Sequence, residues 1–244
     1  AIAAMGIDVG DIENDGDWDL YITDISSKAD PDGNPLFLGS PDGTMSANAA
    51  LAAGVESVNS WPCNFIDFDR DGWVDLWVGT IDTEARDHLF RNEHDGTFTK
   101  RWPDGFLNND SRGGSAADYD GDGDVDLVLW NQALDSVLLR NDSFDPNGWF
   151  ELKLLARTSN LDAIGATAHI THSGITQMRR VSGGDSAHSQ SELIMHFGVG
   201  DAEMLDLTID WPSGTTQSFQ GVAVNQLVFV DELDGIMVED VVQT

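Results

Sequence analysis

Apolar and polar residues alternate in short runs along the first half of this chain, which is the pattern of β-strands. The runs at 20–23, 76–79 and 127–130 combine leucine, aromatic and β-branched residues, and each follows a cluster of acidic residues. A second short apolar run follows each of these strands after a connector, at 34–38, 87–92 and 136–141. We therefore expect three units, each built from a strand, an acidic loop, a strand, a connector and a short strand.

The second half of the chain, residues 146–244, keeps the alternation but loses the acidic loops. Its clearest strand patterns lie at 149–154, 167–171, 205–211 and 226–230, with turn residues between them. We expect about seven strands and no helix in this half, which predicts a compact β-sandwich. The whole chain is therefore predicted to be all-β.

One acidic pattern occurs three times in the first half. Ten-residue stretches begin at residues 11, 67 and 118, with acids at positions 1, 3, 5 and 9, glycine at position 6 and leucine at position 10. We call them loops 1, 2 and 3. The candidate metal ligands, including the position-7 residues whose backbone carbonyl can bind, are Asp11, Glu13, Asp15, Asp17 and Asp19; Asp67, Asp69, Asp71, Trp73 and Asp75; and Asp118, Asp120, Asp122, Asp124 and Asp126.

These loops have the ligand chemistry of calcium sites. Ca²⁺ takes six to eight oxygen ligands, and acids two residues apart in a tight turn can point at one centre. Glycine at position 6 permits the backbone turn that wraps the chain around the ion. Without a cation the clustered carboxylates repel one another. We predict about three bound calcium ions, and we expect magnesium to bind less well because it requires a strict octahedron.

Related acidic motifs fit this chain less well. An EF-hand is excluded, because position 12 is Ile22, Val78 or Leu129 instead of glutamate, and strands instead of helices follow the loops. A two-aspartate phosphotransfer or nucleotide-sugar site would occur once per domain, and three copies disfavour it. Solvated acidic turns between strands remain the alternative interpretation.

The loop starts lie about 50–56 residues apart, which is the range of β-propeller blades. In the acidic loops and the apolar runs that follow them, residues 1–145 resemble FG-GAP/VCBS-type repeats, the calcium-binding blades of integrin-like propellers. The resemblance implies units of about 1–56, 57–110 and 111–145, with calcium held by the four acids of each loop. Glu13 departs from the usual Asp or Asn, which makes loop 1 the weakest match.

Residues 146–244 resemble the ASPIC/UnbV domain, which follows such repeats in the cartilage acidic protein family. The resemblance implies a β domain without defined catalytic residues. The segments that carry it are Ile164-Gly165-Ala166, Ser189-Gln190, His196-Phe197-Gly198-Val199-Gly200, Trp211-Pro212-Ser213-Gly214 and Asn225-Gln226.

Three units are too few for a closed propeller, which has four to eight blades. We expect either further blades in a longer precursor or an open array that packs against the C-terminal domain or another subunit. Open strand edges favour association, so self-assembly through the blade edges is a further expectation. The start at Ala1 and the lack of a signal peptide indicate a mature or trimmed product, or a fragment.

The net charge of −31 restricts the partners. A strongly anionic surface argues against nucleic acid or anionic lipid as a partner, and no stretch is long and apolar enough to insert into a membrane. The charge suits an extracellular or cell-surface protein in calcium-bearing water, although halophilic adaptation would produce the same bias. The one cysteine, Cys63, excludes an intrachain disulfide and is expected to be a buried, inert thiol.

Catalytic motifs are absent from the sequence. The six histidines form no His-Glu-x-x-His motif, and the serines near His188 and Asp185 lack a Gly-x-Ser-x-Gly elbow. We therefore predict a non-enzymatic, extracellular calcium-binding protein of adhesion or structural assembly, with a protein or glycan of the cell surface or matrix as partner. Two alternatives stay open: a carbohydrate-binding module that uses tryptophans of the β-sandwich or of the blades, and an enzyme or accessory protein of a biosynthetic pathway.

Overall fold

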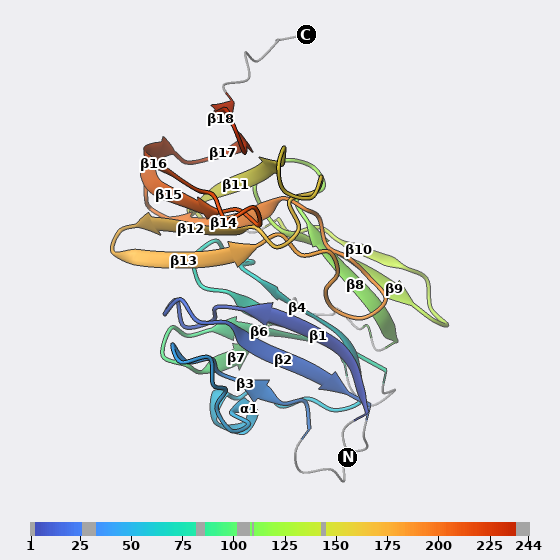
Figure 1. Ribbon diagram of the computed structural model, residues 1–244. Coiled ribbons are helices and arrows are strands. Elements are labelled where there is room, and N and C mark those ends of the chain that lie inside the picture. Colours follow the sequence, from blue (N-terminus) through green and yellow to red (C-terminus); the bar gives the residue numbers. More distant parts are fainter. Residues whose placement is uncertain are drawn as a thin grey trace.

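A computed structural model describes residues 3–25, 33–81, 86–101, 108, 110–142 and 145–237. Over these residues it is all-β, as predicted, with 18 strands in five sheets and one short helix. Three sheets come from the first half of the chain and two from the second, and the two groups lie one above the other in Figure 1. In the part of the chain that is described, no helix has the length and apolarity to cross a membrane.

The first half forms three antiparallel sheets in chain order. Each acidic loop joins the first two strands of its own sheet, so the three units share one design. Sheet 1 contains β1 (Ala4–Gly10), β2 (Asp19–Asp24) and β3 (Leu36–Phe37), and helix α1 (Ala50–Ala53) follows it. Sheet 2 contains β4 (Ser60–Ile66), β5 (Asp75–Thr80), β6 (His88–Asn92) and β7 (Phe98–Lys100). Sheet 3 contains β8 (Ser111–Ala117), β9 (Asp126–Asn131) and β10 (Val137–Leu139).

Adjacent sheets pack face to face through equivalent residues. Tyr21 of sheet 1 is fully buried with Cys63 of sheet 2 in one apolar cluster. Trp77, the equivalent of Tyr21 in the next unit, packs over Gly114 of sheet 3, where a side chain of any size would clash with the indole. Sheets 1 and 2 therefore each pack a large side chain onto the first strand of the following sheet. Burial also raises the pKa of the Cys63 thiol, which agrees with the predicted inert cysteine.

Sheet 3 ends the array with an apolar face. In this sheet Val128 is the equivalent of Trp77, and Leu138 is the equivalent of Leu89. Both side chains are about half exposed, Val128 at 49% and Leu138 at 48%. Leu89, by contrast, packs into the apolar cluster between sheets 2 and 3. Among the described residues, the three sheets form an open row and not a closed ring.

The second half is a two-sheet sandwich, as predicted, with eight strands in the described residues where about seven were expected. The two sheets share one apolar core, and β11 pairs with β17 in parallel. One sheet contains β11 (Gly148–Leu155), β14 (Met195–Gly200), β17 (Gln226–Asp231) and β18 (Gly235–Met237). The other contains β12 (Thr167–His172), β13 (Ile175–Arg180), β15 (Met204–Asp210) and β16 (Thr216–Ala223).

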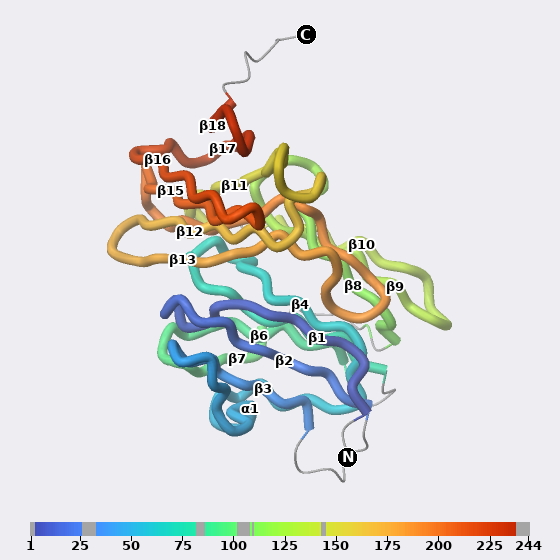
Figure 2. The backbone as a smooth tube through the Cα atoms, viewed as in Figure 1, coloured from blue at the N-terminus to red at the C-terminus, as the bar shows by residue number. Residues whose placement is uncertain are grey.

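The segment between β13 and β14 connects the sandwich to all three sheets of the first half. In Figure 2 part of this segment appears as an orange loop that descends beside β8. Ser186 and Ile7 exchange backbone hydrogen bonds of 2.9 and 3.2 Å, and Ser186 Oγ accepts the Cys63 N–H at 3.1 Å. Ser191 Oγ accepts the Ala116 N–H at 3.1 Å. The first strands of the three sheets therefore share one polar seam with the C-terminal domain.

Candidate metal centres

The three acidic loops share one hydrogen-bond frame. In loop 2 the carboxylate at position 1, Asp67, accepts the N–H groups of Asp71 at 3.1 Å and Gly72 at 2.9 Å. Gly72 has a φ of 91°, and the equivalent Gly16 and Gly123 have φ values of 89° and 88°. These angles lie in the left-handed region that favours glycine, which confirms the predicted turn. The same bonds link Asp11 to Asp15 and Gly16, and Asp118 to Asp122 and Gly123.

The acid at position 9 ties each loop to its own sheet. Asp75 accepts the Phe68 N–H at 3.2 Å with one oxygen and the Asn92 N–H of β6 at 2.7 Å with the other. Asp19 accepts the Ile12 and Gly39 N–H groups, and Asp126 accepts those of Tyr119 and Asn141. The sequence pattern did not indicate this second tether, because its partner lies 15 to 20 residues further along the chain. Burial raises the pKa of Asp75, and it raises that of Asp19 to about 6.

Two of the three loops gather their acids around one point. One carboxylate oxygen from each of Asp67, Asp69 and Asp71 lies within 4.8 Å of the others, and the same holds for Asp118, Asp120 and Asp126. Loop 1 lies wholly inside the described residues, and its acids are not gathered in this way. Asp122 stays outside the loop 3 group. Of the three predicted sites, the structure thus brings candidate ligands together at loops 2 and 3.

Position 7, where a backbone carbonyl was the expected ligand, has a common local geometry. The N–H groups of Asp17, Trp73 and Asp124 each donate to the carboxylate at position 5 of their own loop at 3.0 Å. The Trp73 indole stacks on His94 with ring centroids 4.8 Å apart. The Asp124 carboxylate lies 3.1 Å from Arg70 Nε, which joins loop 3 to loop 2.

Loop 2 has donor atoms that could hold a hard cation. Asp69 belongs to the gathered group and is 7% exposed, and its Oδ1 atom is buried without a hydrogen-bond partner. Burial, together with repulsion from Asp71, raises the pKa of Asp67 to about 7. An unpaired carboxylate oxygen in a buried acidic cluster is costly unless a cation binds it. The donor set consists of oxygen atoms, which is the chemistry that Ca²⁺ prefers.

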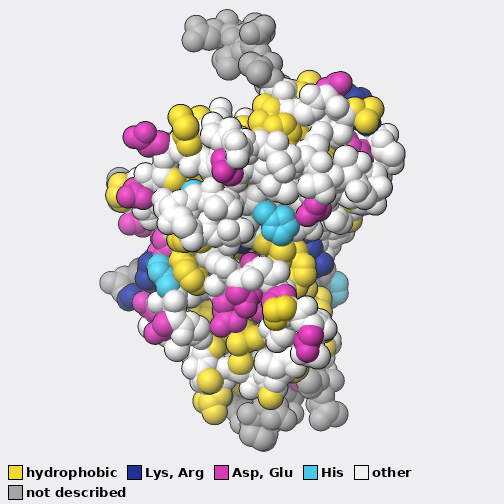
Figure 3. All heavy atoms as spheres, turned by 60° about the vertical axis from the view of Figure 1, so that its left-hand side comes forward, with side chains coloured by type: hydrophobic (Ala, Val, Ile, Leu, Met, Phe, Trp, Pro, Cys, Tyr) yellow, Lys and Arg dark blue, Asp and Glu magenta, His cyan; other side chains and the backbone are white. Residues whose placement is uncertain are grey.

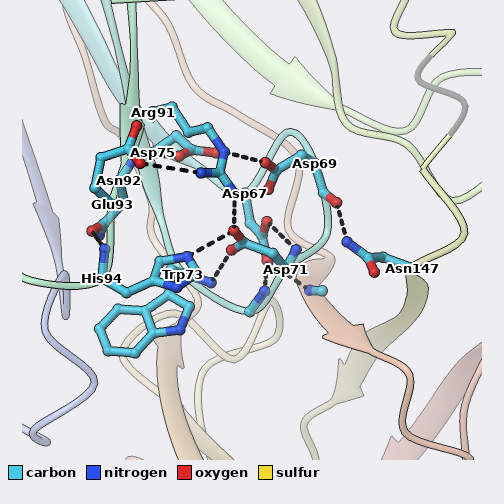
Figure 4. A network of polar contacts seen from close by, with 12 residues as sticks. Asp67, Asp69, Asp71, Trp73, Asp75, Arg91, Asn92, Glu93, His94 and Asn147 are labelled. Carbon is cyan, nitrogen blue, oxygen red and sulfur yellow. Dashed lines mark hydrogen bonds and ion pairs between the residues drawn. The ribbon is translucent and has the colours of Figure 1, made fainter. Parts of the chain in front are cut away.

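In loops 2 and 3 an arginine spans the acids at positions 3 and 5, and neither arginine was among the predicted site residues. Figure 4 shows Arg91 on loop 2, where Nε lies 2.6 Å from Asp69 Oδ2 and Nη2 lies 2.7 Å from Asp71 Oδ2. Arg140 does the same on loop 3, at 3.1 Å from Asp120 and 3.4 Å from Asp122. The signal in the sequence was the Arg-Asn pair that ends the apolar run in units 2 and 3.

The C-terminal domain rests directly on loop 2. The Gly198 N–H of β14 donates to Asp67 Oδ2 at 3.1 Å, and a side chain at Gly198 would clash with that carboxylate. The Gly200 N–H donates to the Arg70 carbonyl at 3.1 Å, and Asn147 Nδ2 donates to the Asp69 carbonyl at 2.9 Å. A cation that orders loop 2 would therefore also order the surface on which the sandwich docks.

Loop 3 also contacts the C-terminal domain. His196 Nε2 donates to the Gly123 carbonyl at 2.8 Å, and the Trp149 indole of β11 covers Gly123 so closely that a side chain there would clash. In the space-filling view, acidic side chains gather on the lower half of the molecule close to its boundary with the C-terminal domain (Figure 3). Loops 2 and 3 thus lie at the junction of the two halves.

One cavity lies at the same junction. It has a volume of about 140 Å³, and its lining includes Asp8, Trp18, Asn64, Arg180 and Asp185. Burial raises the pKa of Asp8 to about 7, and it also raises that of Asp185. The cavity combines an aromatic side chain with carboxylate, amide and guanidinium groups, and it lies beside loop 1.

Comparisons with known proteins agree with the two-part organisation. Residues 67–129 match the model of an FG-GAP-like repeat, and residues 156–236 match the model of ASPIC and UnbV. Cartilage acidic protein 1 of Homo sapiens is 31% identical over 182 residues, which cover 68% of this chain and 27% of that protein. Cartilage acidic protein 1 of Xenopus tropicalis is 29% identical over 161 residues, covering 61% of this chain and 25% of that protein. The chain spans about a quarter of the length of these relatives.

Proposed function

Because the chain joins an FG-GAP-like repeat to an ASPIC and UnbV domain and is distantly similar to cartilage acidic protein 1, we propose that it is a non-enzymatic calcium-binding protein. In this proposal, loops 2 and 3 bind calcium and thereby hold the two halves of the molecule in one fixed arrangement. The observation that carries the proposal is the unpartnered, buried Asp69 Oδ1 in a group of three aspartates, of which Asp67 and Asp69 are buried.

Calcium binding to these loops would stabilise the folded state by mass action. Extracellular modules bind Ca²⁺ with dissociation constants of about 10⁻⁴–10⁻³ M, so calcium at about 1 mM contributes roughly 0.4–1.4 kcal/mol per site. Since Asp67 of loop 2 also accepts the Gly198 N–H, calcium binding at this loop would also stabilise the contact with the sandwich.

The proposed setting is extracellular or at the cell surface, where calcium is abundant enough to fill sites of this strength. Sites of this strength fill only where calcium is about millimolar, and the charge of −31 suits a soluble, unaggregated surface there. In this setting the protein would act in adhesion or structural assembly, with a protein or glycan of the cell surface or matrix as its partner. Nucleic acid and membrane insertion are not part of the proposal.

Thermal melting in calcium and in chelator tests the proposal. We expect the Tm to fall by several degrees in chelator, and to recover with calcium but poorly with magnesium. Asp69→Asn removes the unpaired charge at loop 2 and should reduce the calcium-dependent part of the Tm. Asp162→Asn, at an exposed acid outside the loops, is the matched control. A Tm that is identical in calcium and chelator would refute calcium binding.

The cavity beside Trp18 supports a second candidate function, the binding of a sugar residue. An aromatic ring next to acceptor and donor side chains is suited to the apolar face and hydroxyl groups of a sugar. A glycan array with the unaltered protein and with Trp18→Ala tests this candidate. Binding that is lost in Trp18→Ala would support it, and an array without any bound glycan would rule it out.

A further inference from the structure

Loops 2 and 3 each contain a cation supplied by the chain itself, at the same place in the repeat. Arg91 immediately precedes Asn92, whose N–H donates to the position-9 acid of loop 2. Arg140 immediately precedes Asn141, whose N–H donates to the position-9 acid of loop 3. In both loops the guanidinium spans the acids at positions 3 and 5. The arrangement is therefore a property of the repeat and not of one loop.

Loop 1 provides the natural comparison, because it lacks this cation. Its position-9 acid accepts the Gly39 N–H at 2.9 Å, which makes Leu38 the equivalent of Arg91 and Arg140. Within the described residues, which include all of loop 1 and Leu38, the acids form close groups in the two loops that have the arginine and not in the loop that has leucine. The presence of the arginine and the gathering of the acids thus coincide in three loops out of three.

We infer that Arg91 and Arg140 are internal counter-cations, which hold the acids at positions 3 and 5 of loops 2 and 3 near each other before metal binds and oppose the metal once it is bound. The inference rests on the proposed calcium function. It makes each arginine a positioning residue that sets both the shape of the metal-free loop and the calcium affinity of that loop.

The geometry of loop 2 gives both effects a physical reason. Arg91 bonds to the Oδ2 atoms of Asp69 and Asp71, and the Oδ1 atom of Asp69 stays buried and unpaired. The arginine therefore neutralises the acids without occupying that oxygen. A divalent ion bound by the same carboxylates repels a nearby guanidinium, because both carry positive charge. The coupling is reciprocal, so the arginine lowers the affinity for the metal by the same factor by which the metal weakens the contact between the arginine and the acids.

Each arginine also has an acid outside its loop. Arg91 Nη1 lies 3.5 Å from Glu93, and Arg140 Nε lies 2.8 Å from Asp142. In both units this acid is two residues after the arginine. When metal binds, the guanidinium retains a carboxylate partner outside the loop. Release from positions 3 and 5 therefore does not leave the arginine without a counter-charge.

Replacing the arginine by the residue of loop 1 tests the inference. Arg91→Leu should lower the Tm by several degrees in chelator and by less in saturating calcium, and it should tighten calcium binding at loop 2 about tenfold. Binding is measured by calorimetry with calcium and by terbium luminescence sensitised by Trp73. Arg91→Gln, which keeps the polar side chain without the charge, serves if Arg91→Leu fails to fold. Arg101→Leu is the matched control, since Arg101 contacts Glu93 but none of the loop acids in the described residues.

The reverse exchange adds the cation to the loop that lacks it. Leu38→Arg should raise the Tm in chelator and weaken calcium binding at loop 1. Unchanged or weaker calcium binding in both Arg91→Leu and Arg91→Gln, with the unaltered protein binding normally, would overturn this inference and leave the proposed function intact. If the unaltered protein binds no calcium, the proposed function is wrong, and so is the inference that the arginines lower the calcium affinity. The chelator Tm values of the variants would still confirm or refute the gathering of the acids by arginine.

Discussion

Loops 1 and 2 have the same sequence pattern and the same hydrogen-bond frame, yet they differ in what surrounds them. In loop 2 the position-1 carboxylate accepts three backbone N–H groups, one of which comes from Gly198 of the C-terminal domain. In loop 1 the equivalent Asp11 accepts two, both from its own loop. The shared pattern therefore determines the turn, while contacts from other parts of the chain determine how firmly the acids are held.

Removal of the position-1 carboxylate should give the largest effect and the clearest difference between the loops. Asp67→Ala leaves three N–H groups in a buried site without an acceptor, and we expect a loss of about 3–5 kcal/mol of stability in calcium. Asp11→Ala leaves two such groups, so the expected loss is about 2–3 kcal/mol. Urea unfolding of both variants measures the difference. Equal losses would show that the contact with Gly198 adds nothing to loop 2.

The contact between loop 2 and the sandwich can be tested from the other side. Gly198→Ala places a methyl group against Asp67 Oδ2, which forces the strand or the carboxylate to move. We expect a loss of about 1–3 kcal/mol, together with weaker calcium binding at loop 2 and unchanged binding at loop 1. Site-resolved terbium luminescence, with Trp73 for loop 2 and Trp18 for loop 1, separates the two sites. A uniform change at both loops would contradict a local coupling.

The metal-free protein should become less stable as pH rises. Burial raises the pKa of Asp67 to about 7 and that of Asp19 to about 6, both above the unfolded value of about 3.9. A raised folded pKa means that the folded state binds more protons, so this stability is complete below about pH 4 and is lost as pH rises through 6 to 7. In chelator, the Tm should therefore fall between pH 5 and pH 8.

Calcium should remove most of this pH dependence, because it compensates the charged carboxylates. Melting curves at pH 5, 6, 7 and 8, with and without calcium, provide the measurement. A Tm in chelator that stays constant or rises over this range would contradict the burial of charged acids in loops 1 and 2. Asp67→Asn supplies the control, since a neutral amide at this place should flatten the part of the curve near pH 7.

The sequence was sufficient to predict what depends on neighbouring residues. The three acidic loops, the glycine turns, the strands after them and the two-part organisation all follow from local patterns, and the structure agrees with them. The arginine bridges and the docking of Gly198 depend on contacts between distant segments. Gly198 and Asp67 are separated by 131 positions in the chain, and no periodicity in a single sequence can indicate such a pair. Loop 1 shows the same limit, because its acidic pattern alone did not reveal that Leu38 replaces an arginine.

The smallest effect is expected at position 5 of loop 1. Within the described residues, the Asp15 carboxylate accepts one hydrogen bond, from the Asp17 N–H, and that bond is exposed. We therefore expect Asp15→Ala to lower the stability by about 0.5 kcal/mol in chelator. Asp71, the equivalent in loop 2, accepts the Trp73 N–H and also contacts Arg91 and His94.

Asp71→Ala should therefore cost more than Asp15→Ala in chelator, by about 1 kcal/mol, because a half-buried guanidinium loses one of its carboxylates. In Arg91→Leu this excess should largely disappear, since the partner of Asp71 is already absent. Urea unfolding of the two single variants and of the double variant forms a double-mutant cycle for the Asp71–Arg91 pair. An excess that persists without Arg91 would assign the difference between the loops to Trp73 and His94 instead of the arginine.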